Sequence, residues 1–456
     1  MRILLCCCCV VLAACPEDRE RTGVRDASPD ASFDGALDAR PDVDLNCVPS
    51  DEICDGTDQD CDGEVDEGAP LGCGLNELCI AGSCSCPAER QCGGGCADIG
   101  FDEANCGMCG NQCPGTQVCV EESCCEPRAT PVDLLFVIDN SGSMLEEQEA
   151  LVREFPELFR ALTTGDAEGD GLADFPPIVD LNVGFVTADL GAGPRPPMTC
   201  EEVGDDAELR TAGDVNPSCM ASYPSVLSFR GGDSGAFATD AACLARQGTM
   251  GCGFEQQLEA ALKALTPSTS GISFASGSGR GDGSNAGFLR PGSTLAVVVV
   301  TDEEDCSTGN LELFDQSAVQ FGPELNLRCF NHPDELYPIR RYVSGLSSLR
   351  PSPGKVVFGL LAGVPEELVA RGATYTEILA DPMMQEVVDM TNPTRLASSC
   401  QTPRGLAFPP RRMVETARSF QAQGSPTAVG SICAESYRSF VRELTQRVAG
   451  ATTECQ

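Results

Sequence analysis

Short apolar runs that end in polar loops dominate the pattern of this chain. Residues 134–138 are five apolar side chains, partly β-branched, and such a run is typical of a strand buried on both faces. The polar loop DNSGS follows at 139–143, and apolar positions at near-helical spacing then predict a helix over 145–162. A strand, a tight polar loop and a helix in this order place ligands at the carboxyl end of a parallel sheet.

The same alternation continues toward the C-terminus. A second strand is predicted within 178–190, the most apolar strand within 293–307, and another strand within 355–364. Helices are predicted within 248–265, 335–349, 411–420 and 436–450. This alternation indicates an α/β fold of Rossmann-like type, with a mainly parallel sheet and helices on both faces.

Residues 191–248 interrupt the alternation as a long insertion that contains Cys200, Cys219 and Cys243. Loops of this length are uncommon unless they are functional or stapled. The insertion follows the second predicted strand, so we expect it at the carboxyl edge of the sheet. It either shapes a binding surface there or only covers the edge, and the sequence favours neither alternative.

The chain of 456 residues is strongly acidic, with 69 Asp and Glu against 30 Lys and Arg and a formal net charge of −39. This charge, without any basic patch, excludes binding to nucleic acid and to anionic membrane surfaces, and it favours divalent cations. The 29 cysteines indicate an oxidising compartment. His332 is the only histidine, which argues against Ser–His–Asp catalysis and against zinc–histidine sites.

The N-terminus has the features of a secretory signal, with Arg2, a short apolar run and small residues before Cys15. The run is shorter than the about 20 apolar residues that span a bilayer. The sequence LAAC at 12–15 resembles the lipobox of bacterial lipoproteins, which implies a signal peptide over 1–14 and a lipid on Cys15. An ordinary signal peptide is the alternative. Residue 16 is Pro and not the Asp of an inner-membrane retention signal, which favours the outer membrane of the bacterial cell envelope.

Residues 15–46 show no hydrophobic period and predict an acidic, disordered linker. The next segment, 47–72, spaces its carboxylates as an EF-hand-like loop does, although the usual Glu at position 12 is missing. It resembles the short Cys/Asp repeat of bacterial surface proteins, which implies a Ca²⁺ site. A solvated acidic turn in a disulfide-stapled knot is the alternative. The candidate ligands are Asp58, Asp60, Asp62, Asp66 and Glu67.

Residues 73–124 hold eleven cysteines, many glycines and almost no apolar run, so we expect a module that folds through disulfides. The stretch 92–124 resembles the stigma-specific-protein-type repeat of cysteine-rich modules. Its C-x-x-C lacks the thioredoxin-like context that a redox or zinc role requires. The connectivity of the disulfides cannot be derived from the sequence.

The count of cysteines predicts at least one disulfide between the two halves of the chain. Fifteen cysteines lie between residues 47 and 125 and nine between 200 and 455, so both groups are odd. Cys125 directly precedes the first strand of the large domain and Cys455 follows its last helix. The termini of such domains are often close, so we expect these two cysteines to pair.

The loop at 139–143 has the pattern D-x-S-x-S, and its carboxylate and two hydroxyls are hard oxygen ligands suited to Mg²⁺. With the strand before it and the helix after it, the loop resembles the metal-ion-dependent adhesion site of the von Willebrand factor A (VWA) domain. The resemblance covers residues 125–456. It implies that Ser141 and Ser143 bind the cation directly and that Asp139 acts largely through water.

Two further residues have counterparts in the site of that family. Asp302 matches the Asp of the family's T-D-G-type turn, although Glu303 replaces the Gly. Thr249 matches the Thr that precedes a helix, although Cys252 and two glycines intervene. The resemblance implies Mg²⁺, Mn²⁺ or Ca²⁺ at the site, with Asp302 acting through water and one open position for a carboxylate of a protein ligand.

The turn at 301–305, TDEED, carries more negative charge than the family pattern, and it resembles a bacterial VWA subgroup with D-E-E-D-C at this place. The extra carboxylates imply either tighter capture of the cation or a preference for a cationic ligand. A solvated acidic turn is the alternative.

Taken with the N-terminus, these features predict a surface-anchored lipoprotein that binds a protein ligand through a divalent cation and contacts the membrane only through its lipid. The alternative is a structural or assembly factor of the envelope in which the metal only stabilises the fold. A hydrolase is less favoured, because neither a Ser–His pair nor a separate pair of catalytic carboxylates is visible. The oligomeric state is not indicated.

Overall fold

The computed structural model describes residues 122–455 apart from 215, 403 and 404, together with part of the residues between 54 and 120. The chain divides into two compact units, Met1–Cys96 and Ala97–Gln456. Among the described residues, no helix has the length and apolar character needed to cross a membrane. The lipidation candidate and the candidate calcium ligands lie outside the described residues: Cys15, Asp58, Asp60, Asp62, Asp66 and Glu67.

Short antiparallel pairs of strands make up the described cysteine-rich segments. In the first unit, the pairs are β1 (Leu78–Cys79) with β2 (Cys84–Ser85), and β3 (Gln91–Cys92) with β4 (Gly95–Cys96). The second unit begins with a segment in which β5 (Val118–Val120) pairs with β6 (Ser123–Cys125). The disulfides Cys106–Cys119 and Cys113–Cys124 form the small core of this segment. The expected disulfide framework is therefore present in this part of the chain.

A six-stranded sheet in the order β10-β9-β8-β11-β12-β15 is the centre of the second unit. Neighbouring strands are parallel except for β10, which runs antiparallel to β9 at the edge. Their bounds are β8 (Val132–Ile138), β9 (Leu181–Thr187), β10 (Leu227–Phe229), β11 (Thr294–Val300), β12 (Val356–Ala362) and β15 (Thr427–Ser431). The five parallel strands are buried along their whole length, which explains the nearly continuous apolar runs of β11 and β12. The predicted mainly parallel α/β architecture is confirmed at this level.

The strand order reverses at β8, the first strand of the sheet in the chain. β9, the next strand in the sequence, lies on one side of β8, and β11 lies on the other. Ile138 at the end of β8 is in register with Thr187 of β9 and with Val300 of β11. Ligands of open α/β sheets bind where the order reverses, outside the carboxyl ends of the strands. The loops that leave β8 and β11 therefore occupy the ligand-binding position of this architecture.

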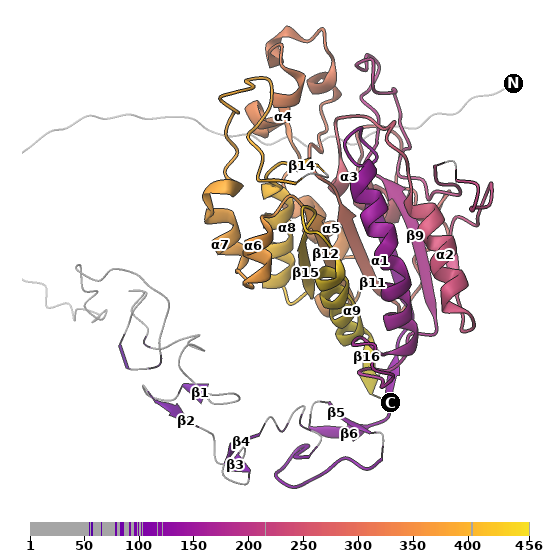
Figure 1. The fold of residues 1–456 in the computed structure, drawn as a ribbon, viewed down its shortest axis with the longest axis vertical. Helices are drawn as coiled ribbons and strands as arrows, with labels where there is room; N and C mark the ends of the chain where they lie inside the picture. The colour runs from indigo at the N-terminus through magenta and orange to yellow at the C-terminus, as the bar shows by residue number, and fades with distance from the viewer. Residues whose placement is uncertain are drawn as a thin grey trace, which may run out of the picture. The chain divides into compact units, whose positions relative to one another are not determined.

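Helices cover both faces of the sheet (Figure 1). Side chains of β8 alternate between the two layers, with Leu134 and Phe136 on one face and Leu135 and Val137 on the other. One layer contains α1 (Leu145–Thr164), α2 (Ser234–Ala245) and α9 (Arg438–Thr452). The other contains α3 (Gln257–Leu265), α5 (Arg340–Ser347), α6 (Glu366–Ala370), α7 (Tyr375–Ala380) and α8 (Arg411–Ala422).

A third, smaller apolar cluster lies beside the carboxyl-end loops. It includes Phe254, Phe314 and Leu336, and α4 (Arg328–Asn331) adjoins it. Figure 1 shows the α4 segment beyond one end of the sheet. The buried Arg328 donates five hydrogen bonds to carbonyl groups between residues 313 and 322, at 2.7 to 3.2 Å, and so fixes this irregular segment.

Disulfides staple the irregular segments of the second unit. Cys200–Cys252 and Cys306–Cys329 join loops of the third cluster, and Cys219–Cys243 joins α2 to the chain before it. Cys400–Cys433 connects the loop after β15 to the small hairpin of β13 (Cys400–Gln401) and β14 (Leu406–Ala407).

The predicted Cys125–Cys455 disulfide stays a prediction, because the side chain of Cys455 lies outside the described part. The backbone is compatible with it: β7 (Pro127–Ala129) pairs with β16 (Thr453–Cys455), and Cys455 stands opposite Pro127. Cys125 takes part in a disulfide. The other eight cysteines between residues 200 and 455 pair with one another in the four disulfides named above.

The region interpreted as an insertion, 191–248, contains regular structure in its second half. There β10 extends the sheet and α2 covers it against α1. Neither element is predictable from the apolar pattern, because β10 has only three residues and α2 consists largely of small residues with weak polar contrast. The second half thus belongs to the sheet and its helix layer, whereas the first half forms irregular loops.

The turn after α1 offers a test of local backbone geometry. Gly165 ends α1 with a left-handed φ of 78°, and a Cβ there would lie 2.1 Å from the Phe175 carbonyl oxygen. Gly171 has φ 88° with open space around it. We expect Gly165→Ala to lower the free energy of unfolding by about 2–3 kcal/mol, because a clash with backbone adds to the strain of the left-handed region. The control is Gly171→Ala, which introduces only the strain of the left-handed region and is expected to lower the free energy of unfolding by about 1 kcal/mol. Equal losses of unfolding free energy for the two variants in urea titrations would contradict the clash.

Candidate functional site

The polar loop after β8 forms the first part of the site. Asp139 is fully buried, and its Oδ1 accepts a hydrogen bond from the Ser141 N–H at 2.8 Å. Its Oδ2 accepts a hydrogen bond from the Thr301 hydroxyl at 2.6 Å. The Ser141 and Ser143 hydroxyl oxygens lie 3.2 Å apart. Asp139 therefore ties the loop after β8 to the loop after β11 and sets the two serines side by side.

The loop after β11 brings a second buried carboxylate to the same place. Asp302 is 1% exposed, and its Oδ1 has no hydrogen-bond partner among the described residues. The Ser143 hydroxyl hydrogen-bonds the Asp302 carboxyl group. The Asp302 carbonyl accepts the Phe408 N–H at 2.8 Å, which fixes the backbone of the turn. Asp302 thus lies beside the serine loop.

The third loop of the site runs from residue 248 to the start of α3. Two hydrogen bonds fix its backbone. The Gly251 N–H donates to the Asn140 carbonyl at 2.8 Å, and the Gln256 N–H donates to the Ala188 carbonyl at 3.0 Å. A Cβ at Gly251 would clash with the Asn140 side-chain amide, so a larger residue there would force Asn140 to move. The loop consequently passes directly over the carboxyl ends of β8 and β9.

Gly253, Phe254 and Glu255 are the residues of the third loop that line the cavity described below, and Thr249 is not among them. Glu255 is 3% exposed, and its Oε1 has no hydrogen-bond partner among the described residues. Thr249 is half-buried and is not among the described cavity-lining residues. The sequence interpretation missed Glu255 because it looked for a hydroxyl. The available signal was a carboxylate two residues before the buried helix α3.

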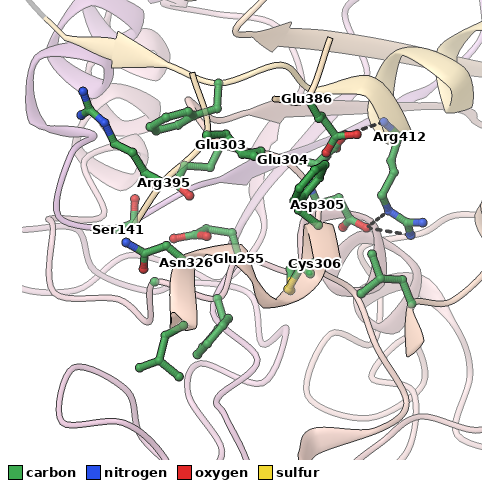
Figure 2. Close-up of a pocket in the computed structure, with 18 of the residues that line it drawn as sticks. Ser141, Glu255, Glu303, Glu304, Asp305, Cys306, Asn326, Glu386, Arg395 and Arg412 are labelled. Atoms are coloured by element: carbon green, nitrogen blue, oxygen red, sulfur yellow. Dashed lines mark hydrogen bonds and ion pairs between the residues drawn. A yellow bond between two sulfur atoms is a disulfide. The ribbon is translucent and has the colours of Figure 1, made fainter. Parts of the chain in front are cut away.

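A cavity of about 590 Å³ opens above these loops. Figure 2 shows Ser141, Glu255 and Glu303 converging on it from three separate loops. Its apolar walls come mostly from the third cluster and from the segment before α8: Phe254, Leu325, Phe330, Pro333, Leu336, Leu396 and Phe408. Its acidic residues are Glu255, Glu303, Glu304, Asp305 and Glu386, and its basic residues among those described are Arg395 and Arg412.

The second half of the acidic turn is held by Arg412. The Glu304 carboxylate accepts the Arg412 N–H at 2.6 Å, and the Arg412 guanidinium donates to Asp305 at 3.2 and 3.3 Å (Figure 2). The same guanidinium donates to the Tyr337 carbonyl at 2.8 Å. Asp305 is fully buried. Asp302 and Asp305 are thus buried and Glu304 is bonded by Arg412, so three of the four carboxylates of the turn contradict the alternative of a solvated acidic turn.

Burial and mutual repulsion raise the pKa values of the carboxyl groups around the serines. Burial raises the pKa of Asp302 to about 9, with further contributions from Asp139 and Glu303. Burial and the charge of Asp139 raise the pKa of Glu303 to about 7. Burial also raises the pKa of Asp139 and holds the pKa of Glu255 well above its usual range. The four carboxyl groups are thus close enough to resist simultaneous ionisation unless a positive charge joins them.

The donor set fits a hard divalent cation. Carboxylate and hydroxyl oxygens are the ligands of Mg²⁺, Mn²⁺ and Ca²⁺, and His and thiolate ligands are not present among the described residues of the cavity. Two buried oxygens, Asp302 Oδ1 and Glu255 Oε1, have no hydrogen-bond donor in the described part of the chain. Buried polar oxygens require such a partner, and a bound cation satisfies that requirement.

A cluster of cysteines in the small segment before the sheet does not form a metal centre. The sulfur atoms of Cys106, Cys113 and Cys124 lie within 4.8 Å of one another. They belong to the disulfides Cys106–Cys119 and Cys113–Cys124, so they offer no thiolate to a metal. Their closeness reflects two packed disulfides.

A scan against protein-family models finds no match to this chain, and a search of curated proteins finds none either.

Proposed function

We propose that this chain is a lipid-anchored binding protein of the bacterial cell envelope, whose VWA-type domain holds a divalent cation and uses it to bind a protein ligand. The cation is Mg²⁺, Mn²⁺ or Ca²⁺. The proposal depends on one observation: Asp139 and Asp302 are buried beside the hydroxyls of two serines. These serines, Ser141 and Ser143, line a cavity at the point where the strand order of the sheet reverses.

The residues of the site divide into two roles under this proposal. Ser141 and Ser143 would hold the cation directly, and Asp139 and Asp302 would orient them and offset its charge. The cation supplies a positive centre to which an electron-rich group of a ligand binds. Thr301 keeps Asp139 in place through its 2.6 Å hydrogen bond. The resemblance alone predicts that the ligand offers a carboxylate.

A binding role is favoured over a catalytic one. The only histidine, His332, packs edge-on against Phe321 at 5.1 Å between ring centroids, and its Nε2 lies 3.3 Å from the Phe321 carbonyl oxygen. It does not line the cavity, so Ser141 and Ser143 have no histidine base beside them.

We propose a second cation site, for Ca²⁺, in the segment 47–72 on its sequence pattern alone.

Cation binding is tested directly by calorimetric titration of Mg²⁺ into the EDTA-treated full chain. We expect one site per chain at the VWA-type domain and its loss in Ser141→Ala/Ser143→Ala, because two ligand oxygens are removed. The matched control is Ser347→Ala/Ser348→Ala, which removes two hydroxyls at the end of α5 and leaves the cavity intact. Unchanged Mg²⁺ binding in the first double variant would refute the assignment.

An adhesive role and a purely structural role predict different results for Asp139→Ala. Envelope extract is passed over the immobilised chain in Mg²⁺ and in EDTA, and the melting temperature of each variant is measured. Lost capture with an unchanged melting temperature supports adhesion. A large fall in melting temperature supports an assembly or envelope-organising protein with a structural ion.

A further inference from the structure

The cavity above the serine loop is lined by two kinds of side chain that meet directly. The serines and the acidic residues form its polar part, and the apolar residues named above form its walls. Phe254 and Glu255 are consecutive residues, so their Cα atoms lie about 3.8 Å apart. The Phe408 N–H donates to the Asp302 carbonyl at 2.8 Å, which joins a second wall residue to the polar part. A ligand residue that binds the cation therefore brings its neighbour in the chain within reach of the apolar walls.

The apolar walls are held in place by the protein itself. The Phe254 ring stacks on the Phe314 ring with 4.3 Å between the centroids. The Cys306–Cys329 disulfide joins two loops that both line the cavity. The buried Arg328 fixes the chain between these cysteines through its five hydrogen bonds to carbonyl groups. Walls held in this way form a pocket before a ligand arrives, so little ordering opposes binding.

The walls require a contact that the cation and its ligand group do not supply. A group that binds a divalent cation is polar, and a polar group is not stabilised by apolar walls. Apolar walls are stabilised when an apolar group takes the place of water beside them. The rings of Phe254, Phe330 and Phe408 favour an aromatic occupant, because aromatic rings contact one another edge-to-face or offset-stacked. The volume of about 590 Å³ lies within the range of about 300–1,000 Å³ that ligand pockets show.

Exposed methionines on the loops of the cavity favour a polypeptide as the partner. Met250 is 92% exposed on the loop that carries Phe254, and Met390 is 99% exposed on the segment that leads to Leu396. Methionine is enriched at protein interfaces, where its flexible thioether adapts to the surface of a partner. A segment of a protein chain can contact these side chains outside the cavity while its own side chains enter the cavity.

We infer that the ligand is a polypeptide segment in which the residue that binds the cation has a bulky apolar neighbour, an aromatic residue above all. The side chain of this neighbour packs among Phe254, Phe330 and Phe408. The inference rests on the proposed function for the cation and for the electron-rich group bound to it. It assigns the apolar walls of the cavity to the choice of ligand.

Three peptides test the inference: fluorescein-Gly-Phe-Glu-Phe-Gly-amide, the same peptide with Ser in place of both Phe residues, and the same peptide with Gln in place of Glu. An aromatic residue on each side of Glu makes the direction of the bound peptide irrelevant. Binding to the full chain in Mg²⁺ is measured by fluorescence polarisation, and Mg²⁺ binding by calorimetry. We expect the Phe-Glu-Phe peptide to bind at least tenfold more tightly than the Ser-Glu-Ser peptide. Equal binding of these two peptides, or binding of neither, overturns the inference.

The Gln peptide and the calorimetry separate a failure of the inference from a failure of the proposed function. If Mg²⁺ does not bind, or if the Gln peptide binds as tightly as the Glu peptide, the proposed function fails and the inference fails with it. If Mg²⁺ binds and Gln weakens the peptide but Ser does not, only the inference fails.

The Phe330→Ser variant tests the walls without changing any oxygen ligand. Phe330 is half-buried in α4 and lines the cavity. We expect the variant to weaken the Phe-Glu-Phe peptide about tenfold and to leave the Ser-Glu-Ser peptide unchanged, because only an apolar contact is lost. The matched control is Phe175→Ser, which removes a half-buried ring in the turn after α1, outside the cavity, and leaves both affinities unchanged. Unchanged binding of the Phe-Glu-Phe peptide to Phe330→Ser would contradict the placement of the aromatic residue.

Discussion

Mg²⁺ is expected to raise the melting temperature of the EDTA-treated protein strongly at pH 8.5 and only weakly at pH 5.5. Cation binding requires ionised carboxylates, and burial raises the pKa of Asp302 to about 9 and the pKa of Glu303 to about 7. At the lower pH the cation must displace protons from both groups. At the higher pH Glu303 is already ionised, and fewer protons oppose binding.

Without a cation, the same groups make the protein less stable as the pH rises. In the unfolded chain, the carboxyl groups of Asp302 and Glu303 have ordinary pKa values of 3.8 and 4.5. At these two groups the folded protein therefore holds more protons than the unfolded chain between about pH 4 and about pH 9, and their contribution to stability falls across this window. We expect the melting temperature in EDTA to be lower at pH 8.5 than at pH 5.5.

The size of the Mg²⁺ effect follows from mass action. At a concentration of 100 times Kd, a ligand that binds only the folded state adds about 2.7 kcal/mol to the free energy of unfolding. Scanning calorimetry at both pH values, with and without Mg²⁺, measures the effect, and Ser141→Ala/Ser143→Ala is the variant that should not respond. A response of equal size at the two pH values would show that these carboxyl groups do not take part.

The contrast between β11 and β15 shows how far apolar pattern predicts this fold. β11 consists of seven apolar or β-branched residues between polar loops, so its position is evident from the sequence. β15 is TAVGS, and β10 has three residues; both are too short and too polar to stand out. They are strands because the neighbouring strand offers hydrogen bonds to them, which is a property of the assembled sheet.

Glu255 shows a similar limit for the site. Asp139, Ser141, Ser143 and Asp302 follow strands directly, so strand prediction alone places them at one edge of the sheet. The position of Glu255 depends on a loop that is fixed by the Gly251–Asn140 hydrogen bond and the Cys200–Cys252 disulfide. Neither contact is local in sequence. The family motif expects a Thr in the loop before a helix, and the sequence interpretation therefore chose Thr249.

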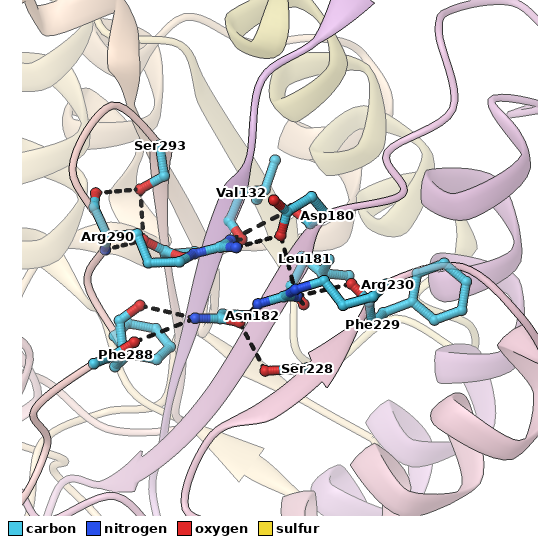
Figure 3. Close-up of polar contacts among 12 residues, drawn as sticks. Val132, Asp180, Leu181, Asn182, Ser228, Phe229, Arg230, Phe288, Arg290 and Ser293 are labelled. Carbon is cyan, nitrogen blue, oxygen red and sulfur yellow. Dashed lines mark hydrogen bonds and ion pairs between the residues drawn. The ribbon is translucent and has the colours of Figure 1, made fainter.

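The largest loss of stability is expected for Asp133→Asn, at the opposite end of β8 from the site. Asp133 is fully buried, and its Oδ1 accepts the Arg290 guanidinium at 2.7 Å while its Oδ2 accepts the Arg290 N–H at 2.6 Å. Arg350, with 5% of its side chain exposed, lies 3.5 Å from the same carboxylate. Figure 3 shows Arg290 reaching between Asp180, the Val132 carbonyl and Ser293.

Replacing this carboxylate by an amide keeps its shape but leaves two arginines without their shared negative charge. Breaking a buried ion pair in this way costs about 3–5 kcal/mol, because the remaining charge stays buried. The control is Asp180→Asn, whose side chain is 42% exposed and bonds the same Arg290; an exposed pair contributes about 1 kcal/mol or less. Urea titrations that give similar small losses for both variants would mean that water reaches Arg350.

The same variant separates stability from binding. Asp133 and Asp139 lie six residues apart along β8, which corresponds to about 20 Å at about 3.3 Å per residue. The arginine network and the carboxylate site share the strand but none of the contacts described above, so their effects are expected to be additive. Asp133→Asn should therefore melt at a lower temperature and still gain the full Mg²⁺ increment at pH 8.5. A reduced increment would mean that the strand transmits strain from its amino end to Asp139.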